Sequence, residues 1–480
     1  MSIPFLSRIF RPAAQRSLEA ASGSHRWTGR PASGDAQAWV RAGAGTVAVR
    51  AAHFALNNPH GARMVQSLSD NVVGAGIKPK ARSDSPIVNA ALHRAFDTLT
   101  NEIDWTGQGD FYAMQRAAMA DMVIHGEALL MWRASASGIP QLQRLHPEQL
   151  DRSITRVVSD DIRIIQGVEF HASTGRPNSY WIRPSAPGDA LAGMAAPAVR
   201  IPASSIIHIF RPLLPGQVRG LSWLAPVLLA GHEIDQLLDA LLVRAKVSAL
   251  HTGFIYNADS SSPYSGQQQG DVLTVGMEPG SLVNLPSNKR IEFSEPPDSG
   301  NAPELAVSIL RTMAAGIGLT YEQLTGDYSH VSYSSARAAT LEFRRFCEAI
   351  QHHVIVFQFC RRVWTEFLRW QVLIGTVPAT AFADPAKGLQ SAKWLPPSWP
   401  WVDPQKDANA AILEMNANLR SRSEVIAERG YDAEEVDAEI AADQARAERL
   451  GIALKAATAT ESQTDEAPRD SVVQGDQNAA

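Results

Sequence analysis

The sequence predicts an α+β protein, because short strand-like segments fill one part of the chain and long helical patterns dominate the rest. Strand-like segments bounded by Asn, Gly and Pro occupy residues 128–210. Long stretches with apolar residues at three- and four-residue spacing follow at 222–250, 303–318 and 335–372. With 480 residues, the chain has room for roughly three domains.

The first half of the chain is predicted to be an arm followed by a mixed domain. Residues 19–46 are rich in Gly, Ser and Ala without a period, so we expect a flexible basic arm over 1–46. Within it, Met1–Arg16 interleaves apolar residues with arginines; a frayed terminus is the simpler interpretation and a short amphipathic docking helix the alternative. Helices are predicted at 47–67, 85–99 and 111–125, and strands at 128–133, 141–145, 162–170, 179–182 and 206–210.

The second half is predicted to contain two helices that bracket a small β-rich module. The first helix opens at Ser222 and carries an apolar stripe, and the second starts at Pro303, since proline favours the first helical position. Between them, residues 251–300 are rich in turns around short strands at 254–256, 272–275 and 291–293.

A polar loop, Thr325–Tyr333, follows the second helix and precedes a third. Ser334 or Ser335 caps this third helix, which continues to about Val372. A straight helix of that length would span about 57 Å, so we expect it to bend. Short helices with an acidic face are predicted over 404–455, and the polar residues 456–480 are predicted to be disordered.

The charge is unevenly distributed along the chain. The formal net charge is −5, whereas residues 1–50 hold seven arginines against Glu19 and Asp35. Residues 404–480 hold eight basic and sixteen acidic residues. A body near neutrality has no uniformly basic surface, so any nucleic-acid role must rest on local geometry.

The two cysteines, Cys347 and Cys360, cannot form a disulfide framework, which is typical of a protein from a reducing cytoplasm. Both are expected to pack in a helix as small apolar residues. No apolar run reaches the ~18 residues of a membrane span, so no membrane association is predicted.

No motif for catalysis, a cofactor or a metal is present in the sequence. GxxxxGK[ST], GxGxxG, HExxH and GxSxG are all missing. The pair His232-Glu233 lacks a second histidine, and His125-Gly126-Glu127 lacks the paired cysteines of a zinc deaminase. We therefore predict neither an enzyme nor a cofactor.

Four segments carry a specific resemblance. The first is Arg211-Pro-Leu-Leu-Pro-Gly-Gln-Val-Arg-Gly-Leu-Ser-Trp-Leu-Ala-Pro226, and the others are Gly318–Tyr328, Tyr333–Arg337 and Leu341–Arg345. In this order they resemble the portal proteins of lambda-type tailed bacteriophages. Supporting matches are Asn57–Pro59, Asn71–Ile77 and Trp401–Pro404.

The resemblance implies a portal fold with a division of the chain into named parts. It implies a wing over 47–220, a first stem helix over 221–250, a clip over 251–300, a second stem helix over 301–324, a tunnel loop over 325–334, a long wing helix and return over 335–403, and a crown over 404–455. It also implies DNA-channel residues, which we assign to Tyr328, Ser329, His330, Tyr333, Arg244 and Lys246. Docking of partners is assigned to Lys289 and Arg290 in the clip.

The implied function is a passive channel for packaging and ejecting double-stranded DNA. The resemblance implies a ring of about twelve subunits at one capsid vertex, assembled in the host cytoplasm and retained in the virion. Its implied partners are DNA without sequence specificity, the terminase large subunit, the major capsid or scaffold protein and a head-tail adaptor.

Three alternatives stay open at this point. A non-portal helical scaffold or head-tail connector would form a ring without a clip or tunnel loop. An enzyme with an unrecognised site would be a compact monomer with a deep polar pocket. For the loop itself, Tyr328 and Tyr333 could simply pack against the following helix.

Overall fold

The computed structural model describes residues 36–136, 138–188, 196–249, 253–257, 289–293, 301–329, 331–383, 392–399 and 404–452. The chain divides into two compact units, Met1–Pro397 and Ser398–Ala480. The predicted strand 272–275, the first 35 residues of the predicted arm and the predicted disordered tail lie outside the described residues.

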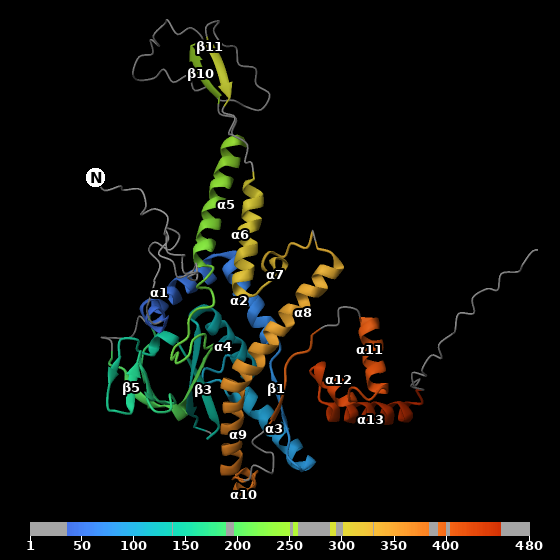
Figure 1. Ribbon diagram of the computed structural model, residues 1–480. Helices are drawn as coiled ribbons and strands as arrows, with labels where there is room; N and C mark the ends of the chain where they lie inside the picture. Colours follow the sequence, from blue (N-terminus) through green and yellow to red (C-terminus); the bar gives the residue numbers. More distant parts are fainter. Residues whose placement is uncertain are drawn as a thin grey trace, which may run out of the picture. The chain divides into compact units, whose positions relative to one another are not determined.

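The first unit begins with helices α1 (Ala36–Asn57) and α2 (Pro59–Val72) (Figure 1). The prediction of one helix over 47–67 is wrong, because Pro59 starts a new helix whose cap is Asn58; its side-chain oxygen accepts a 2.9 Å hydrogen bond from Gly61 N. The prediction of a flexible arm up to residue 46 is wrong over 36–46. Alanine favours helix, and the small Ala44 is buried where α1 packs.

Two antiparallel sheets form the centre of this unit. The three-stranded sheet has the order β3 (Pro140–Leu145), β2 (Glu127–Ala134) and β9 (Ile206–Phe210). The five-stranded sheet runs in chain order through β4 (Arg156–Val157), β5 (Ile162–Ile165), β6 (Val168–His171), β7 (Pro177–Ile182) and β8 (Val199–Pro202). The segment predicted as one strand over 162–170 is two strands, because Gln166 and Gly167 adopt positive φ and reverse the chain. Short 3₁₀ turns, η3 (Pro147–Gln149) and η4 (Ala203–Ser205), join the two sheets.

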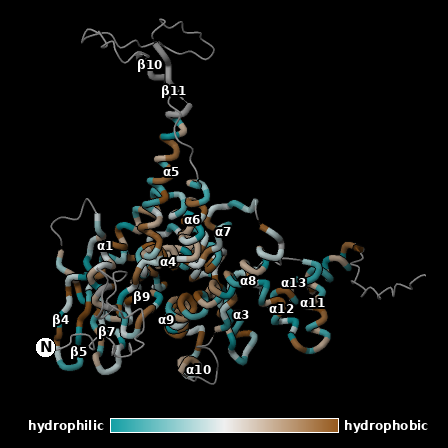
Figure 2. The backbone as a smooth tube through the Cα atoms, turned by 45° about the horizontal axis from the view of Figure 1, so that its top comes forward, coloured by the Kyte–Doolittle hydropathy of each residue, from teal (hydrophilic) through white to brown (hydrophobic). Residues whose placement is uncertain are grey.

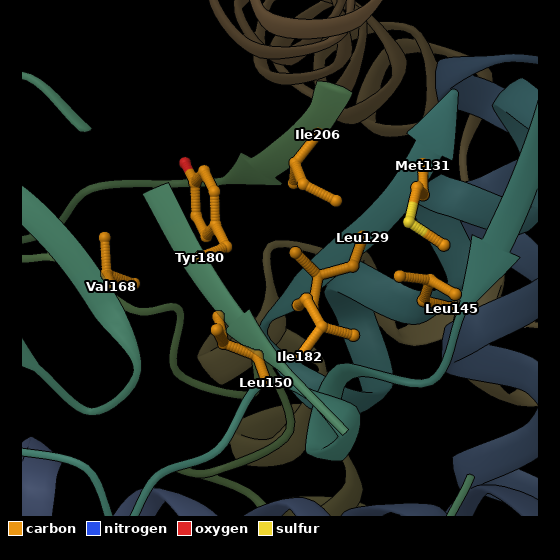
Figure 3. Close-up of a cluster of buried hydrophobic side chains, with 8 residues drawn as sticks. All are labelled: Leu129, Met131, Leu145, Leu150, Val168, Tyr180, Ile182 and Ile206. Atoms are coloured by element: carbon orange, nitrogen blue, oxygen red, sulfur yellow. The ribbon is translucent and has the colours of Figure 1, made fainter. Parts of the chain in front are cut away.

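A hydrophobic core lies where the two sheets meet (Figure 3). Leu129, Met131 and Ile206 from the three-stranded sheet face Tyr180 and Ile182 from β7. Leu129 and Ile206 are fully buried. Burying such side chains stabilises the fold by roughly 1.5–3 kcal/mol each.

Helices α3 (Pro86–Glu102) and α4 (Phe111–His125) meet the long C-terminal helix of this unit in an aromatic cluster. The ring of Phe96 lies 5.1 Å from that of Phe367 and 5.6 Å from that of Phe111, edge to face in both cases. A two-stranded sheet, β1 (Lys78–Ala81) with β12 (Ala392–Leu395), closes the same region after α10 (Ala379–Ala383).

The long helix expected after the polar loop is present and bends. It consists of α8 (Tyr333–Ile350), a π-helical stretch η5 (Gln351–Cys360) and α9 (Arg361–Leu373). Figure 1 shows that the axis changes direction between α8 and α9, where the π-helical turns loosen the hydrogen-bond ladder. The side-chain amide of Gln358 in η5 binds the backbone N–H and carbonyl of Phe210 in β9. Its Oε1 accepts from Phe210 N at 3.0 Å, and its Nε2 donates to Phe210 O at 2.9 Å.

Helices α5 (Leu228–Ala249) and α6 (Ala302–Ile317) form a pair that lies side by side (Figure 1). Helix α5 starts at Leu228 and not at Ser222, because residues 223–227 form tight turns in which Ala225 N donates to Ser222 O and Val227 N donates to Leu224 O. Between these helices in the sequence, β10 (Gly253–Asn257) pairs antiparallel with β11 (Lys289–Phe293), in agreement with the two short strands predicted there. A short helix, α7 (Tyr321–Thr325), follows α6.

The second unit is helical over its described residues. It comprises α11 (Pro404–Asn416), α12 (Arg422–Glu428) and α13 (Ala433–Leu450). Arg420 forms ion pairs with Glu414 and Glu428, and Arg422 pairs with Asp437. The predicted short helices are therefore present in 404–452.

Candidate functional site

The predicted tunnel loop begins where α7 ends. Gly326 has φ +74°, the left-handed conformation that lets the chain turn sharply after the helix. Asp327 Oδ1 then accepts hydrogen bonds from Ser329 N at 3.0 Å and Ser329 Oγ at 2.6 Å, which forms a compact Asx turn. Ser332 ends the loop by capping α8, so the prediction of a cap at Ser334 or Ser335 is wrong; both lie in the first turn of the helix.

Tyr328 is 61% exposed, so most of its surface is open to solvent. Ser329 is also exposed. His330 and the side chain of Tyr333 lie outside the described residues, although the backbone of Tyr333 forms the first residue of α8. The exposure of Tyr328 favours the channel prediction over the packing alternative for this residue.

The other predicted DNA-channel residues lie elsewhere on the helix pair. Lys246 is exposed and Arg244 partly buried, both near the C-terminal end of α5. Helix α7 and then the loop follow the C-terminal end of α6, which runs antiparallel to α5 and ends near its start (Figure 1). The distance along α5 from Arg244 back to Leu228 is roughly 25 Å. Of the described residues, Tyr328 and Ser329 therefore lie in the loop after α7, whereas Arg244 and Lys246 lie near the C-terminal end of α5.

The predicted docking residues, Lys289 and Arg290, are the first two residues of strand β11. In the register of the hairpin, Arg290 faces Tyr256 and Lys289 faces Asn257 across the two strands.

A buried charged cluster, which the sequence did not reveal as a site, fixes the chain just before α5. Arg219 is 1% exposed and Glu127, on β2, is fully buried. The Arg219 guanidinium donates to both Glu127 oxygens and also to the carbonyls of Pro147, Leu150 and Gln166. Every donor direction of this arginine therefore has an acceptor, as a buried cation requires.

Three further groups complete the cluster, among them Arg152, whose Nη2 donates to Glu127 Oε1 at 3.3 Å. His208 on β9 lies 2.9 Å from Glu127 Oε2, and Gly220 N donates to the same oxygen at 2.9 Å. Burial alone would raise the pKa of Glu127, but Arg219 and His208 hold that pKa well below its usual value. Burial lowers the pKa of His208, and its contact with Glu127 acts in the opposite direction.

Close backbone contact explains the glycines around this cluster. A Cβ on Gly220 would lie 2.0 Å from Gly126 O, and Gly126 itself has φ +91°. The chain segment that leads into α5 can therefore press directly against the start of β2. A signal was available in the sequence: Arg219 and Gly220 lie in the segment 211–226 that carries the resemblance.

The residues that the structure describes do not assemble a metal site. In that part of the chain, no three His, Cys, Asp or Glu side chains gather as metal ligands. Cys347 and Cys360 are buried free thiols in α8 and η5, and burial raises both pKa values, that of Cys347 to about 12. None of the described helices is long and apolar enough to cross a membrane.

The comparisons with known proteins agree with the motifs. Residues 22–351 match the family described as phage portal protein, lambda family. A probable portal protein of Halomonas phage phiHAP-1 is 28% identical over 94% of this chain and 88% of its own length. Portal protein B of Escherichia phage lambda is 24% identical over 81% of each chain.

Among solved structures, a chain from the neck of a native GTA particle computed with C12 symmetry is similar. It is 16% identical with a TM-score of 0.41, covering 84% of this chain and 95% of that one. The family match alone spans more than half of the sequence. The chain therefore belongs to the lambda family of phage portal proteins, whose members are structural rather than enzymatic.

Proposed function

We propose that this protein assembles into a ring of about twelve copies at one vertex of a phage capsid and that double-stranded DNA passes through the ring. The observation that supports assembly is the α5–α6 pair, which we name the stem. Leu238 and Leu242, one helical turn apart on α5, are 43% and 52% exposed, and Leu305 on α6 is 53% exposed. Figure 2 shows how hydrophobic and hydrophilic residues alternate along α5.

Apolar side chains on a helix pair that leaves them uncovered favour contact with another copy. A closed ring requires head-to-tail contacts in which different faces of neighbouring subunits meet. The stem offers two such faces, one on each helix. We therefore propose that stems of adjacent copies pack side by side around the channel.

The channel is proposed to be passive. The sequence contains no phosphate-binding loop for a nucleoside triphosphate, so force has to come from a separate motor, the terminase, which we propose docks on the clip. Weak and renewable contacts suit a conduit, because each released phosphate contact would otherwise slow the DNA. Tyr328 and Lys246, both exposed, are proposed to make contacts of this kind at two levels.

We also propose further partners and a location for the ring, on the basis of the family membership. A head-tail adaptor and the major capsid or scaffold protein are the expected further partners. The ring is expected to form in the host cytoplasm and to remain at the portal vertex of the virion. The family membership supports this assignment.

The ring is tested by measuring the mass and shape of the purified full chain. A ring of about twelve 52.0 kDa subunits has a mass of roughly 600 kDa. Light scattering should detect this species, and negative-stain images should show a central hole. The double variant Leu238→Glu/Leu242→Glu should dissociate it, whereas Leu213→Glu, at a 55% exposed position outside the stem, should not.

A single species of ~52 kDa over a range of salt and protein concentrations would contradict the proposed ring. Intact rings in the double glutamate variant would place the contact between copies on another surface. Far-UV circular dichroism of each variant separates a loss of assembly from a loss of folding.

A further inference from the structure

Two histidines meet at the wall of a cavity in the first unit. His125 is the last residue of α4, and His146 lies between β3 and η3. Their ring centres are 4.9 Å apart, and the ring planes form an angle of 63°. Both side chains line a cavity of about 440 Å³ and are partly exposed, so water can exchange protons with them.

The side chain of His146 caps η3. Glu148 N donates to His146 Nδ1 at 3.1 Å, and His146 N donates to Gln149 Oε1 at 2.9 Å, which makes a reciprocal capping box. A ring nitrogen that accepts a hydrogen bond carries no proton, so this cap requires a neutral imidazole. A protonated imidazole has two N–H donors and no acceptor, so it cannot make the same bond to Glu148 N.

The capped turn helps to hold Arg219. The carbonyl of Pro147, in η3, and the carbonyl of Leu150, directly after it, each accept from Arg219 at 3.1 Å. Only one other backbone carbonyl, that of Gln166, binds this guanidinium among the described residues. A displaced η3 would therefore take acceptors away from a buried cation, and Arg219 fixes the chain just before α5.

The charged groups around the two histidines are already paired with one another. In the described part of the chain they are Asp104, Asp121, Glu127, Glu148, Arg144 and Arg152. Glu148 accepts from Arg152 Nε at 2.9 Å. Asp121 accepts from Arg144 Nε at 2.8 Å and from its Nη2 at 3.1 Å. An extra positive charge on a histidine would have to compete with these arginines for a carboxylate.

The two remaining carboxylates are occupied as well. Asp104 accepts from the backbone N–H groups of residues 106, 108 and 109 in its own loop, and Glu127 accepts from Arg219. His125 Nδ1 is buried without a hydrogen-bond partner among the described residues. Burial lowers the pKa of His125 to about 4, and His146 acts in the same direction. Burial also lowers the pKa of His146, although Glu148 opposes this effect.

We infer that His146 is an acid-sensitive cap, whose neutral ring holds η3 in place and whose protonation releases η3 together with two of the acceptors of Arg219. One proton from solvent is bound for each cap that opens, and Glu148 N then donates to water. Acid would thus loosen the chain segment that leads into α5. This inference goes beyond the proposed channel and does not depend on it.

The effect of pH on the cap has a defined direction. Because the folded-state pKa of His146 lies below the ordinary value of 6.5, its contribution to stability is complete above about pH 6.5 and is lost as the pH falls toward the folded-state value. Measurements at pH 7.5 and 5.0 stay above the range in which Glu127 loses its charge. His60 and His208 also have lowered pKa values, so each variant is compared with the native chain at the same pH.

The test is hydrogen exchange at single backbone amides of the full chain, measured by mass spectrometry at the two pH values. Protection is the ratio of the intrinsic to the measured exchange rate, which corrects for the direct effect of pH. The reporter is Glu148 N. The matched control is Gly61 N, which donates at 2.9 Å to the side chain of Asn58, a cap that does not titrate. In the variant His146→Asn, the amide oxygen can accept from Glu148 N at either pH.

An imidazole of ordinary pKa that binds a proton only when the cap is open favours the open form about thirtyfold more at pH 5.0 than at pH 7.5. We expect the protection of Glu148 N in the native chain to fall by about ten- to thirtyfold, and that of Gly61 N to stay nearly constant. In His146→Asn the fall at Glu148 N should largely disappear. An equal fall in native chain and variant, or an equal fall at Gly61 N, would overturn the inference.

The native chain also tests the inference without any variant, since constant protection of Glu148 N from pH 7.5 to 5.0 would overturn it. Far-UV circular dichroism at pH 7.5 establishes that His146→Asn is folded. The link to the stem is tested at Gly220 N, which donates to Glu127 beside Arg219. Its protection should fall in acid by less in His146→Asn than in the native chain. Equal falls would overturn the connection between the cap and Arg219.

Discussion

The buried pair Glu127–Arg219 should contribute strongly to stability, and Glu127→Gln is the sharpest test of that. The amide keeps the size of the carboxylate but leaves the guanidinium of Arg219, 1% exposed, without a counter-charge. The carbonyls of Pro147, Leu150 and Gln166 still accept hydrogen bonds from Arg219, so the cation keeps these three hydrogen bonds. Breaking a buried ion pair from one side costs about 3–5 kcal/mol, and we expect a loss in that range.

The matched control is an exposed ion pair in the same unit. Arg116 Nε lies 2.7 Å from Asp70 Oδ1, and the two side chains are 47% and 43% exposed. Because water screens such a pair, Asp70→Asn should cost less than about 1 kcal/mol. Urea unfolding at one fixed protein concentration measures both losses, since assembly would otherwise stabilise the folded state by mass action.

The stability that the Glu127 carboxylate contributes should decrease as the pH falls. The folded-state pKa of Glu127 lies below the usual value of 4.5, so its charge stabilises the fold fully above the unfolded-state pKa. That stabilisation is lost as the pH falls below about 4.5 toward the folded-state pKa. The difference between the native chain and Glu127→Gln should therefore shrink in acid.

Replacing both partners measures the interaction energy between Glu127 and Arg219. The double variant Glu127→Gln/Arg219→Met should lose less stability than the two single variants together, since no uncompensated charge is left in the core. A loss below about 1 kcal/mol for Glu127→Gln, or a loss that does not change with pH, would refute the reasoning.

Three further predictions concern other parts of the chain. Gly220→Ala should destabilise the first unit strongly in urea unfolding, because the new Cβ would lie 2.0 Å from a backbone oxygen. The control Gly43→Ala, whose Cβ would have no atom within 4 Å, should stabilise it by roughly 0.5–1 kcal/mol. Equal effects of the two changes would contradict the close contact at Gly220. Changing residues 328–330 to Gly should preserve rings and melting temperature but reduce packaged DNA length in an infection assay, and normal packaging would exclude a role of the loop in the channel. Charge reversal at Lys289 and Arg290 should weaken pull-down of terminase while rings persist, and unchanged binding would move the docking surface elsewhere.

The sequence predicted the order of helices and strands well where local patterns are strong. Pro303 marked the start of α6, and the excess length of the third helical pattern predicted the bend that η5 provides. The β1–β12 pair was not predicted, because Ala81 and Ala392 are joined only by tertiary pairing and each strand is very short. The helical start at Ala36 was missed because a Gly- and Ala-rich composition resembles a linker until burial is known.

The site was predictable only in part. The motif 211–226 was recognised by resemblance, but its physical role depends on Glu127, a residue far away in the sequence. Glu127 was considered only as part of an incomplete zinc motif, whereas it is the anion that neutralises Arg219. Long-range ion pairs of this kind leave no periodic signal, so spacing alone could not reveal them.

The contact between Gln358 and Phe210 has a consequence for copies of this chain held close together. Strand β9 is an edge strand of its sheet, and an open edge offers unpaired backbone groups to any neighbouring strand. The amide of Gln358 occupies the N–H and the carbonyl of Phe210, as a further strand would. A helix thus closes the edge at this point, so many copies can be crowded together without their sheets joining there into aggregates.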